Sequence, residues 1–444
     1  MTLSELRSKI QNKSARLAVI GQGYVGLPVA AMFAEKGFNV LGVDVLPELV
    51  AKINQGINPI DGKEPGLAEL LKIAISSGRL RATTEHNELG DRDIFLIAVE
   101  TPVDENHIPR YEALRAALTS LASVMKHGSL VIIESTVAPR TMHDVALPLL
   151  EEYSGKKLND GFYLGNCPER VMPGKLLKNL RLMSRVAGGM SSDTADAMIA
   201  LYKNIVEADL DAADCITAEL VKTVENAYRD VQIAFANEVA LIAEAAGGDV
   251  WKVRELVNKS PMRQMHLPGA GVGGHCIPKD PWLLVHGANE RGVPLRLIPA
   301  ARSVNDSMPS HMAELVQDAL KEAGCEIKGA RVAILGYSYL EDSDDTRNSP
   351  SEALAHILLD LGADPVIHDP WIPEYNGDVY ERVKGCDAVV MMVAHSVYRG
   401  LDLNALHATL KNPILVDGRK MFAQEPALRQ GFAYYRVGSA LLRE

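Results

Sequence analysis

A glycine-rich turn between an expected strand and an expected helix constrains the fold of this chain more than any other feature. The segment RLAVIGQGYVGLPVAAMFAEKGFNVLGVDV, residues 16–45, places Gly21, Gly23 and Gly26 in the order G-x-G-x-x-G. Gly21 permits a tight turn, Gly23 lets the backbone approach a pyrophosphate, and Gly26 lets the helix pack closely on the strand. The N-terminus of that helix then faces the phosphate charge. The spacing therefore predicts a βαβ unit that binds a dinucleotide.

The acid at the end of the second strand indicates which dinucleotide is bound. Asp44 follows Gly26 by eighteen residues and can accept hydrogen bonds from both hydroxyls of a ribose. An aspartate here repels a 2′-phosphate, and the adjoining sequence DVLPE contains no arginine, so NAD is expected rather than NADP. The residues predicted to hold it in this unit are Gly21, Gly23, Tyr24, Val25, Gly26 and Asp44.

Two threonines follow the third and fourth strands expected in the same sheet. Thr101 lies in AVETPVDE and Thr136 lies in ESTVAPRT. Ligands of open parallel sheets bind at the carboxyl ends of the strands, so both threonines are predicted to lie near the nicotinamide half of NAD. A threonine after a strand is also commonly a turn residue or a helix cap, and that interpretation stays open.

Short β-rich runs alternate with helical runs in the first and last parts of the chain, as is typical of parallel sheets. The runs are RLAVIG, NVLGVDV, DIFLIAV and SLVIIES, and then, after Gly324, ARVAILGYSY, DPVIHDP, CDAVVMMVA and NPILVDGR. Residues 211–246 contain neither proline nor glycine and carry apolar groups at helical spacing. They predict one long helix.

The chain of 444 residues is longer than one hydrophobic core usually serves. We expect an α/β fold in which two Rossmann-like, doubly wound parallel-sheet domains are joined by a long-helix central domain. The expected boundaries are 1–210 for the NAD-binding domain, 211–315 for the central domain and 316–444 for the last domain. The long helix is expected to serve as a spine and dimer contact, with a solvent-exposed linker as the alternative.

Bulk properties exclude several classes of protein. No run approaches the roughly 18 apolar residues that span a bilayer, and the first residues lack the apolar core of a signal peptide, so a cytoplasmic protein is expected. The formal charge of −11, with no Lys/Arg-rich tract, argues against nucleic-acid binding. The five cysteines include no CxxC pair, so neither a disulfide framework nor a metal site is expected.

One cysteine lies in an unusual setting. The stretch GVGGHCIPKDP, residues 271–281, puts Cys276 behind a run of glycines and before Lys279 and Asp280. Glycines at 269, 271, 273 and 274 let the loop approach a ligand closely. An isolated cysteine is commonly an inert small hydrophobe, but nearby lysine charge favours the thiolate. Cys276 is therefore a candidate nucleophile beside a pocket.

Polar residues on the long helix and in a second loop are further candidates. Lys222 and Asn226 are four residues apart and share a helix face, with Arg229 near the same edge; a solvated polar stripe is the alternative. The loop GNCPERVMPGK places Glu169 and Arg170 between two prolines after an expected strand at 162–166. Rigid loops at strand ends carry function more often than packing, although an exposed Glu-Arg pair is otherwise ordinary.

Together these segments resemble the UDP-glucose/GDP-mannose dehydrogenase family of nucleotide-sugar 6-dehydrogenases. The motifs that carry the resemblance occur in the family's order over nearly the whole chain: GQGYVGLP, ETPVDE, ESTV, CPERVMPG, ELVKTVENAYRDVQIAFANE, PGAGVGGHCIPKDP and SDDTRNSP. The resemblance implies oxidation of a sugar C6 alcohol to a carboxylate with two NAD, through a thiohemiacetal and then a thioester on Cys276. The other catalytic residues that it implies are Lys222 and Asn226 at the oxyanion, Asp280 as the group that orients a base or water, and Glu169 in hydrolysis.

The resemblance extends to the sugar and its nucleotide. CPERVMPG is similar to the CPERVLPG pattern of members that act on UDP-N-acetylmannosamine, and UDP-N-acetylglucosamine stays the alternative. The last domain lacks GxGxxG after VAILG and is expected to hold UDP, whereas Arg347 matches a position that reaches the cofactor. Tyr339 precedes a leucine where many relatives have Phe-Lys, and Arg263 lies one position later than the relatives' arginine. The substrate-binding residues implied are Glu169, Arg170, Val171, Lys222, Asn226, Arg229, Arg263, Gly273, Tyr339 and Arg419.

Other classes of function stay open. A two-electron dehydrogenase of hydroxy-acid type is built from the same parts but performs no thioester step. A catalytically silent NAD- or nucleotide-binding regulator would leave Cys276 without a purpose. If the chain is a nucleotide-sugar 6-dehydrogenase, as the resemblance implies, it is expected to form a homodimer or higher homo-oligomer and to serve polysaccharide synthesis.

Overall fold

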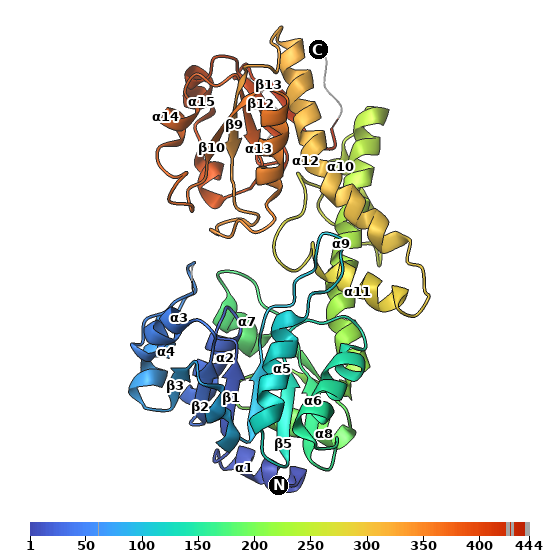
Figure 1. The fold of residues 1–444 in the computed structure, drawn as a ribbon. Coiled ribbons are helices and arrows are strands. Elements are labelled where there is room, and N and C mark those ends of the chain that lie inside the picture. The colour runs from blue at the N-terminus through green and yellow to red at the C-terminus, as the bar shows by residue number, and fades with distance from the viewer. Residues whose placement is uncertain (61, 423–426, 428–429, 440–444) are drawn as a thin grey trace. The chain divides into compact units, whose positions relative to one another are not determined.

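The computed structural model describes residues 1–60, 62–422, 427 and 430–439 of the chain. These residues divide into two compact units, and each unit contains one sheet (Figure 1). Unit 1 consists of Met1–Glu225 and Trp282–Pro294, and unit 2 of Asn226–Pro281 and Leu295–Glu444. Within the described ranges, every helix is too short or too polar to span a lipid bilayer.

The sheet of unit 1 has eight strands in the order β3-β2-β1-β4-β5-β6-β7-β8. Neighbouring strands are parallel except β6 and β7, which are antiparallel. The order reverses direction beside β1, as in a doubly wound sheet. The strands are β1 (Arg16–Ile20), β2 (Asn39–Val43), β3 (Leu80–Thr83), β4 (Ile94–Ile97), β5 (Ser129–Ile133), β6 (Phe162–Asn166), β7 (Arg185–Gly189) and β8 (Leu210–Asp214).

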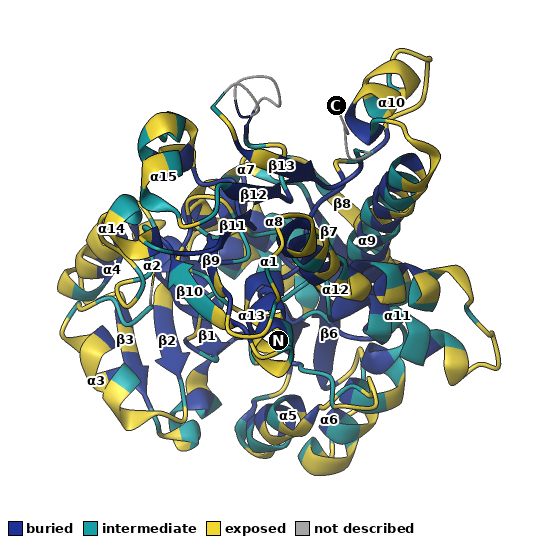
Figure 2. Ribbon diagram, turned by 90° about the horizontal axis from the view of Figure 1, so that it is seen from above, coloured by how far each residue is buried: buried dark blue, intermediate teal, exposed yellow. Residues whose placement is uncertain are grey.

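Helices cover both faces of this sheet because alternate strand residues point to opposite faces. Leu17 and Val19 of β1 pack with α1, α2, α4, α7 and α8, whereas Ala18 and Ile20 pack with α5 and α6. Figure 2 shows the strands of this core as buried. The helices are α1 (Leu3–Gln11), α2 (Gly26–Glu35), α3 (Pro47–Asn54), α4 (Leu67–Ser76), η1 (His86–Asp91), α5 (Glu112–Val124), η2 (Met142–Ala146), α6 (Leu147–Ser154), α7 (Leu176–Leu182) and α8 (Ser192–Tyr202).

The long helix expected over residues 211–246 is α9 (Cys215–Ala246), so the prediction is wrong at its start. Residues 211–214 belong to β8, whose five residues pair in register with β7. Asp214 then begins the helix, because its carboxylate accepts the N–H of Thr217 at 2.9 Å. Sheet pairing on one side and a capping carboxylate on the other set this boundary.

Unit 2 contains a five-stranded, fully parallel sheet in the order β10-β9-β11-β12-β13. Val332 and Ile334 pack toward α12 and α13, and Ala333 and Leu335 pack toward α14 and α15. The expected α/β class with two doubly wound sheets is therefore confirmed. The strands are β9 (Arg331–Leu335), β10 (Asp364–His368), β11 (Ala388–Met391), β12 (Ile414–Asp417) and β13 (Ala433–Arg436), and the helices are α10 (Val250–Val257), α12 (Leu297–Glu322), α13 (Pro350–Asp360), α14 (Val379–Val383), η3 (Ser396–Gly400) and α15 (Leu403–Thr409). The helix α11 (Asp280–Asn289) belongs to unit 1 from Trp282 onward.

Candidate functional site

The three glycines of the dinucleotide turn have different surroundings. A Cβ on Gly21, where φ is +89°, would lie 2.6 Å from the carbonyl oxygen of Ala98, and a Cβ on Gly26 would lie 1.9 Å from the carbonyl oxygen of Gly21. Gly23 is exposed, and a Cβ there would meet nothing within 4 Å. Packing therefore requires Gly21 and Gly26, whereas Gly23 presents bare backbone to a ligand.

Asp44 stands at the end of β2, as predicted. Its Oδ2 accepts the N–H of Gln22 at 2.7 Å and its Oδ1 accepts the N–H of Leu46 at 3.1 Å, so the carboxylate is fixed beside the glycine turn. No side chain caps the first turn of α2, whose positive end stays open to an anion. The bare backbone, the uncapped helix and the fixed acid together fit the pyrophosphate and ribose of NAD.

Tyr24 connects this turn to the loop that follows β6. Its hydroxyl donates to Glu64 Oε1 at 2.5 Å, and the same carboxylate accepts the N–H groups of Gly174 and Leu176 at 2.8 and 3.0 Å. Val25, the other predicted contact in the turn, packs against the core below. The glycine turn and the end of the CPERVMPG loop therefore share one acceptor.

Thr101 and Thr136 lie side by side, at the carboxyl ends of β4 and β5. The Thr101 hydroxyl donates to the carbonyl oxygen of Thr136 at 2.7 Å. The missed strand β3 makes these strands the fourth and fifth in chain order rather than the third and fourth.

Glu169 and Arg170 follow β6 and differ in how they are held. Glu169 is buried, and no described group donates a hydrogen bond to its Oε2. Arg170 donates from Nε to Glu225 Oε2 at 2.8 Å and from Nη1 to Ser184 Oγ at 3.0 Å. The buried acceptor of Glu169 is suited to a water or a ligand hydroxyl, while Arg170 is oriented by α9. Val171 is half-buried against the core.

Glu219 is a residue of this region that the sequence analysis missed. It lies on α9 three residues before Lys222, and its two carboxylate oxygens accept the N–H groups of Arg140 and Met142 at 2.7 and 2.8 Å. Burial raises its pKa to about 7 against the effect of these two donors. The helix that carries Lys222, itself buried, is thereby joined to the segment after Thr136. An acid at i−3 from Lys222 on the same helix was the available signal.

In unit 2, the glycines before Cys276 allow close packing on residues 337–350. A Cβ on Gly273 would lie 2.6 Å from the carbonyl oxygen of Asn348, and Gly274 donates its N–H to the carbonyl oxygen of Arg347 at 2.9 Å. Asn348 returns a hydrogen bond from Nδ2 to the carbonyl oxygen of Gly274 at 3.0 Å. The glycines were expected to admit a ligand, and their close neighbours here are protein atoms.

Cys276 begins the turn that leads into α11. Its carbonyl oxygen accepts the N–H groups of Lys279 and Asp280 at 3.1 and 2.8 Å, and its side chain is half-buried. Asp280 is fully buried, and its Oδ2 accepts a hydrogen bond from Asn226 Nδ2 at 2.6 Å. Lys279 Nζ lies 3.2 Å from Asp280 Oδ1. The structure thus joins Asn226 of the long helix to the cysteine turn.

Burial, together with nearby charges, shifts the pKa of two residues near the cysteine turn. Burial, followed by the charge of Asp345, raises the pKa of Tyr339 to about 12, although the charges of Arg347 and Arg229 act to lower it. Burial, followed by the charges of Lys279 and Arg347, lowers the pKa of His275 to about 4. His275 is therefore neutral at physiological pH.

Two predicted substrate arginines of unit 2 differ in position. Arg419 donates from Nε to the carbonyl oxygen of Met392 at 2.7 Å and from Nη2 to that of Gly271 at 3.4 Å, beside the glycine loop. Arg263 is exposed and donates to the carbonyl oxygen of Pro261 at 3.0 Å. The contacts of Arg263 in unit 2 are therefore local.

A buried polar network between α9 and α12 fixes the start of the glycine loop. Asn237 Oδ1 accepts the N–H of Gly269 at 2.9 Å, and its Nδ2 donates to Asn305 Oδ1 at 2.9 Å. Asn305 and Arg302 both donate to Asp230 Oδ1, at 2.7 and 2.6 Å. Asp230 and Asn237 are seven residues apart on one helix face, which is the signal by which sequence could have revealed them.

Comparison with known proteins agrees with this geometry. Residues 15–206 match the NAD binding domain of the UDP-glucose/GDP-mannose dehydrogenase family, residues 216–307 its central domain and residues 333–424 its UDP binding domain. A UDP-N-acetyl-D-mannosamine dehydrogenase of Pyrococcus horikoshii is 38% identical over 423 residues, which are 95% of this chain and 99% of that protein. A solved structure of UDP-N-acetyl-D-mannosamine dehydrogenase from that organism aligns with a TM-score of 0.89.

A second solved structure, an NDP-N-acetyl-D-galactosaminuronic acid dehydrogenase from Methanosarcina mazei, is 34% identical. The alignment covers 99% of this chain and 98% of that one, with a TM-score of 0.87. All three domains of one family are thus matched in order, and the relatives align over nearly their whole length. This chain belongs to the UDP-glucose/GDP-mannose dehydrogenase family.

Proposed function

We propose that this chain oxidises the C6 hydroxymethyl group of UDP-N-acetylmannosamine to the carboxylate, in a four-electron reaction with two NAD. The observation that carries the proposal is the turn at Cys276, in which a half-buried thiol lies four residues before the buried Asp280 bonded to Asn226. The sugar is inferred from the CPERVMPG loop and from the name of the Pyrococcus relative. The product suits glycan or surface-polysaccharide synthesis in the cytoplasm.

Unit 1 holds the cofactor in this proposal. Gly21, Gly23, Tyr24, Val25 and Gly26 form the pyrophosphate turn and Asp44 binds the ribose, with Thr101 and Thr136 at the nicotinamide half. Arg347, a residue of unit 2, is proposed as a further contact of NAD. NAD, when bound, supplies the acceptor for the two hydrides that leave C6.

The thiol of Cys276 retains the substrate between the two oxidations. The first oxidation leaves an aldehyde, and the Cys276 thiolate forms a C–S bond to its carbon to give a thiohemiacetal. The second oxidation leaves a thioester. Water then adds to the thioester carbon, the C–S bond breaks, and the carboxylate product and the Cys276 thiolate separate.

Four side chains assist these steps in the proposal. Lys222 and Asn226 stabilise the oxyanion that develops at C6. Asp280 orients the Asn226 amide and a water, and Glu169, whose buried Oε2 lacks a described donor, activates water for hydrolysis.

In this proposal the first and last domains each have their own ligand, and three of the catalytic residues also contact the substrate. Residues 1–210 form the NAD-binding domain, 211–315 the central domain and 316–444 the domain that holds UDP. The substrate contacts are Glu169, Arg170, Val171, Lys222, Asn226, Arg229, Arg263, Gly273, Tyr339 and Arg419.

The proposed assembly is a homodimer through α9. Tyr228, Phe235 and Ile242 on this helix are 62%, 58% and 65% exposed. Together with the exposed Leu220 and Val224 they recur at intervals of four and seven residues, which places them on one helix face. A single self-complementary apolar face is typical of a contact between two copies of one chain.

The test is to follow NADH formation from NAD and a panel of UDP-sugars. UDP-N-acetylmannosamine is expected to give two NADH per sugar and to be preferred over its N-acetylglucosamine and N-acetylgalactosamine counterparts. Equal or better use of another sugar would overturn the substrate assignment, and one NADH per substrate would favour a two-electron dehydrogenase.

Substitution of the nucleophile tests the mechanism. Cys276→Ser is expected to lower the rate of acid formation by more than about a thousandfold, as loss of a nucleophile does in other covalent enzymes. NAD binding, measured by fluorescence, should be retained. Unchanged turnover of the Cys276→Ser variant would exclude a thioester.

A further inference from the structure

A loop of unit 2 connects the parallel sheet to the glycine loop before Cys276. This loop, residues 337–348, follows β9 and precedes α13. Its last residues, Arg347 and Asn348, bond Gly274, and its Tyr339 side chain would lie 2.6 Å from a Cβ on Gly273. The conformation of the 337–348 loop therefore determines where the glycine loop can lie.

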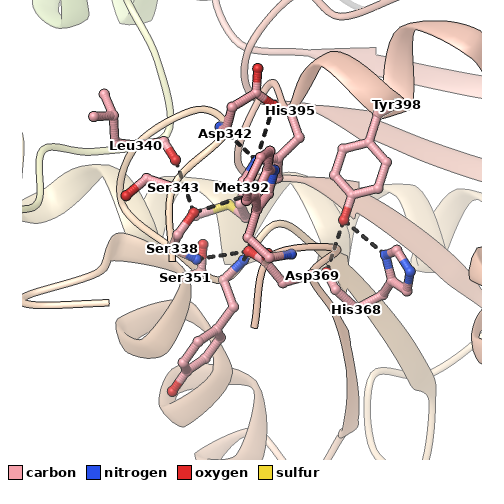
Figure 3. A network of polar contacts seen from close by, with 12 residues as sticks. Ser338, Leu340, Asp342, Ser343, Ser351, His368, Asp369, Met392, His395 and Tyr398 are labelled. Atoms are coloured by element: carbon pink, nitrogen blue, oxygen red, sulfur yellow. Dashed lines mark hydrogen bonds and ion pairs between the residues drawn. The ribbon is translucent and has the colours of Figure 1, made fainter. Parts of the chain in front are cut away.

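A buried histidine of the β11–η3 connection holds the middle of this loop. His395 is fully buried, and its Nδ1 accepts the N–H of Asp342 at 2.9 Å. Its Nε2 lies 3.0 Å from Asp369 Oδ2 and 3.3 Å from Ser338 Oγ (Figure 3). Ser338 itself donates to the carbonyl oxygen of Leu340 at 2.9 Å. One imidazole thus contacts the start and the middle of the loop.

These contacts define the proton on His395. A backbone N–H can only donate, so Nδ1 must carry a lone pair toward Asp342. The proton therefore resides on Nε2, where Asp369 accepts it. Asp369 also accepts the N–H groups of Tyr337, Ser338 and Trp371 at 2.7, 2.9 and 2.8 Å, so the carboxylate is saturated by donors. These contacts hold His395 with its proton on Nε2.

Asp342 needs this support because of its backbone conformation. Its φ is +54°, a left-handed conformation that non-glycine residues seldom adopt. Its Oδ1 accepts hydrogen bonds from the N–H and hydroxyl of Ser396 at 2.8 and 3.0 Å. His395 therefore holds the backbone of Asp342, and Ser396 holds its side chain. Such backbone strain persists only where the surroundings impose it.

We propose that His395 is a positioning residue for substrate binding: through the N–H of Asp342 it sets the 337–348 loop, and through that loop Tyr339 and the glycine loop before Cys276. This inference rests on the proposed function, in which the last domain binds UDP and Tyr339 contacts the substrate. It requires no contact between His395 and the substrate itself.

Two substitutions of His395 test the roles of its two ring nitrogens separately. Glutamine can present an amide donor near Nε2 but leaves the N–H of Asp342 without its acceptor, whereas asparagine can present an oxygen near Nδ1 and loses the bond to Asp369. His395→Gln is expected to weaken UDP binding and to raise KM for the UDP-sugar by about tenfold, as loss of a buried hydrogen bond does. His395→Asn should have the smaller effect on both, and KM for NAD should stay within about twofold in both variants.

His368 supplies the matched control. It is buried in the same cluster but bonds Tyr398 at 2.9 Å and Gly377 at 3.1 Å, both outside the 337–348 loop. His368→Asn should lower the melting temperature without raising the Kd for UDP. A His368 variant that weakens UDP binding as much as His395→Gln would overturn the proposal, because the effect would then be one of general destabilisation.

Hydrogen exchange tests the proposal without turnover. Amides of residues 337–348 should exchange faster in His395→Gln than in the wild-type protein, while those of β9 and β11 stay protected. Nitrogen NMR of the wild-type protein should show an unprotonated Nδ1 on His395. Unchanged exchange, or a protonated Nδ1, would overturn the proposal. Absence of turnover with every UDP-sugar would instead contradict the proposed function. Hydrogen exchange and nitrogen NMR would then still decide whether His395 positions the 337–348 loop.

Discussion

At the scale of single residues, the three glycines of the dinucleotide turn differ in the space available for a side chain. Gly21 and Gly26 face backbone oxygens closer than any Cβ can approach, while Gly23 faces open space. The motif is one pattern in sequence, but packing requires glycine at two of its positions, whereas the third is open and is proposed to face NAD. Substitution can therefore separate folding from cofactor binding.

Gly23→Ala is expected to fold normally and to raise KM for NAD by about tenfold, because its methyl group would occupy the space where the pyrophosphate approaches the backbone. Steady-state kinetics and thermal melts measure the two effects. Gly400→Ala is the control, since a Cβ there also meets nothing within 4 Å. Gly26→Ala should instead fail to fold stably. A Gly23→Ala variant with unchanged KM would show that this glycine does not face NAD.

At the scale of elements, α9 is joined to its surroundings by buried polar groups. Near its start, Glu219 accepts two N–H groups of residues 140–142. Near its middle, Asn237 accepts the N–H of Gly269. Both contacts fix loops that carry predicted site residues. The helix therefore positions these loops as well as its own side chains.

Glu219 gives the protein a pH-dependent stability. Its folded pKa of about 7 lies above the ordinary 4.5, because burial disfavours the charge. The folded state therefore holds a proton that the unfolded state releases, and this contribution, roughly 3 kcal/mol, is complete below pH 4.5 and is lost as the pH rises through 7. Melting temperatures from pH 4.5 to 8 should fall less steeply in Glu219→Gln than in the wild-type protein. Parallel curves would contradict the burial of an acid with this pKa.

Asn237→Ala would leave the N–H of Gly269 and the Oδ1 of Asn305 without buried partners. The free energy of unfolding should fall by about 2–3 kcal/mol. The loop before Cys276 should also loosen, so the thiol should react faster with iodoacetamide in the folded variant. Asp318→Ala, at an exposed position of α12, is the control. An alkylation rate equal to that of the wild-type protein would show that the network does not govern the loop.

Sequence patterns predicted the elements whose signals are local. The glycine turn, Asp44, the strand at 162–166 and the start of the turn at Cys276 all follow from short-range chemistry. Strands β3 and β13, at sheet edges, were not predicted, because the segments LRAT and AYYR carry little apolar periodicity. The antiparallel pair β6–β7 and the His395 contacts depend on residues distant in sequence, which the sequence of a single chain cannot reveal.

At the scale of the whole molecule, the chain forms two compact units, each built around one sheet, and α9 runs from the first into the second. The apolar side chains on one face of α9 are exposed, and no described helix of this chain covers them. A second copy is the partner that the regular spacing suits.

Phe235→Asp is expected to convert a dimer to a monomer, because it puts a charge into the middle of the apolar face. Light scattering after gel filtration measures the mass. Leu359→Asp, at a residue of α13 that is 53% exposed, is the control for a charge placed elsewhere. A wild-type protein that is already monomeric at micromolar concentration would contradict the proposed assembly.

Glu64 has a consequence for engineering this protein. Its carboxylate serves both the hydroxyl of Tyr24 and the amides of Gly174 and Leu176. A CPERVMPG loop replaced by that of a relative has to reproduce the backbone at 174–176, or the Glu64 carboxylate loses two donors and its hydrogen bond with Tyr24 is altered. Under the proposed function, in which Tyr24 contacts NAD and the CPERVMPG loop contacts the sugar, exchange of that loop and retention of NAD affinity are a single design problem.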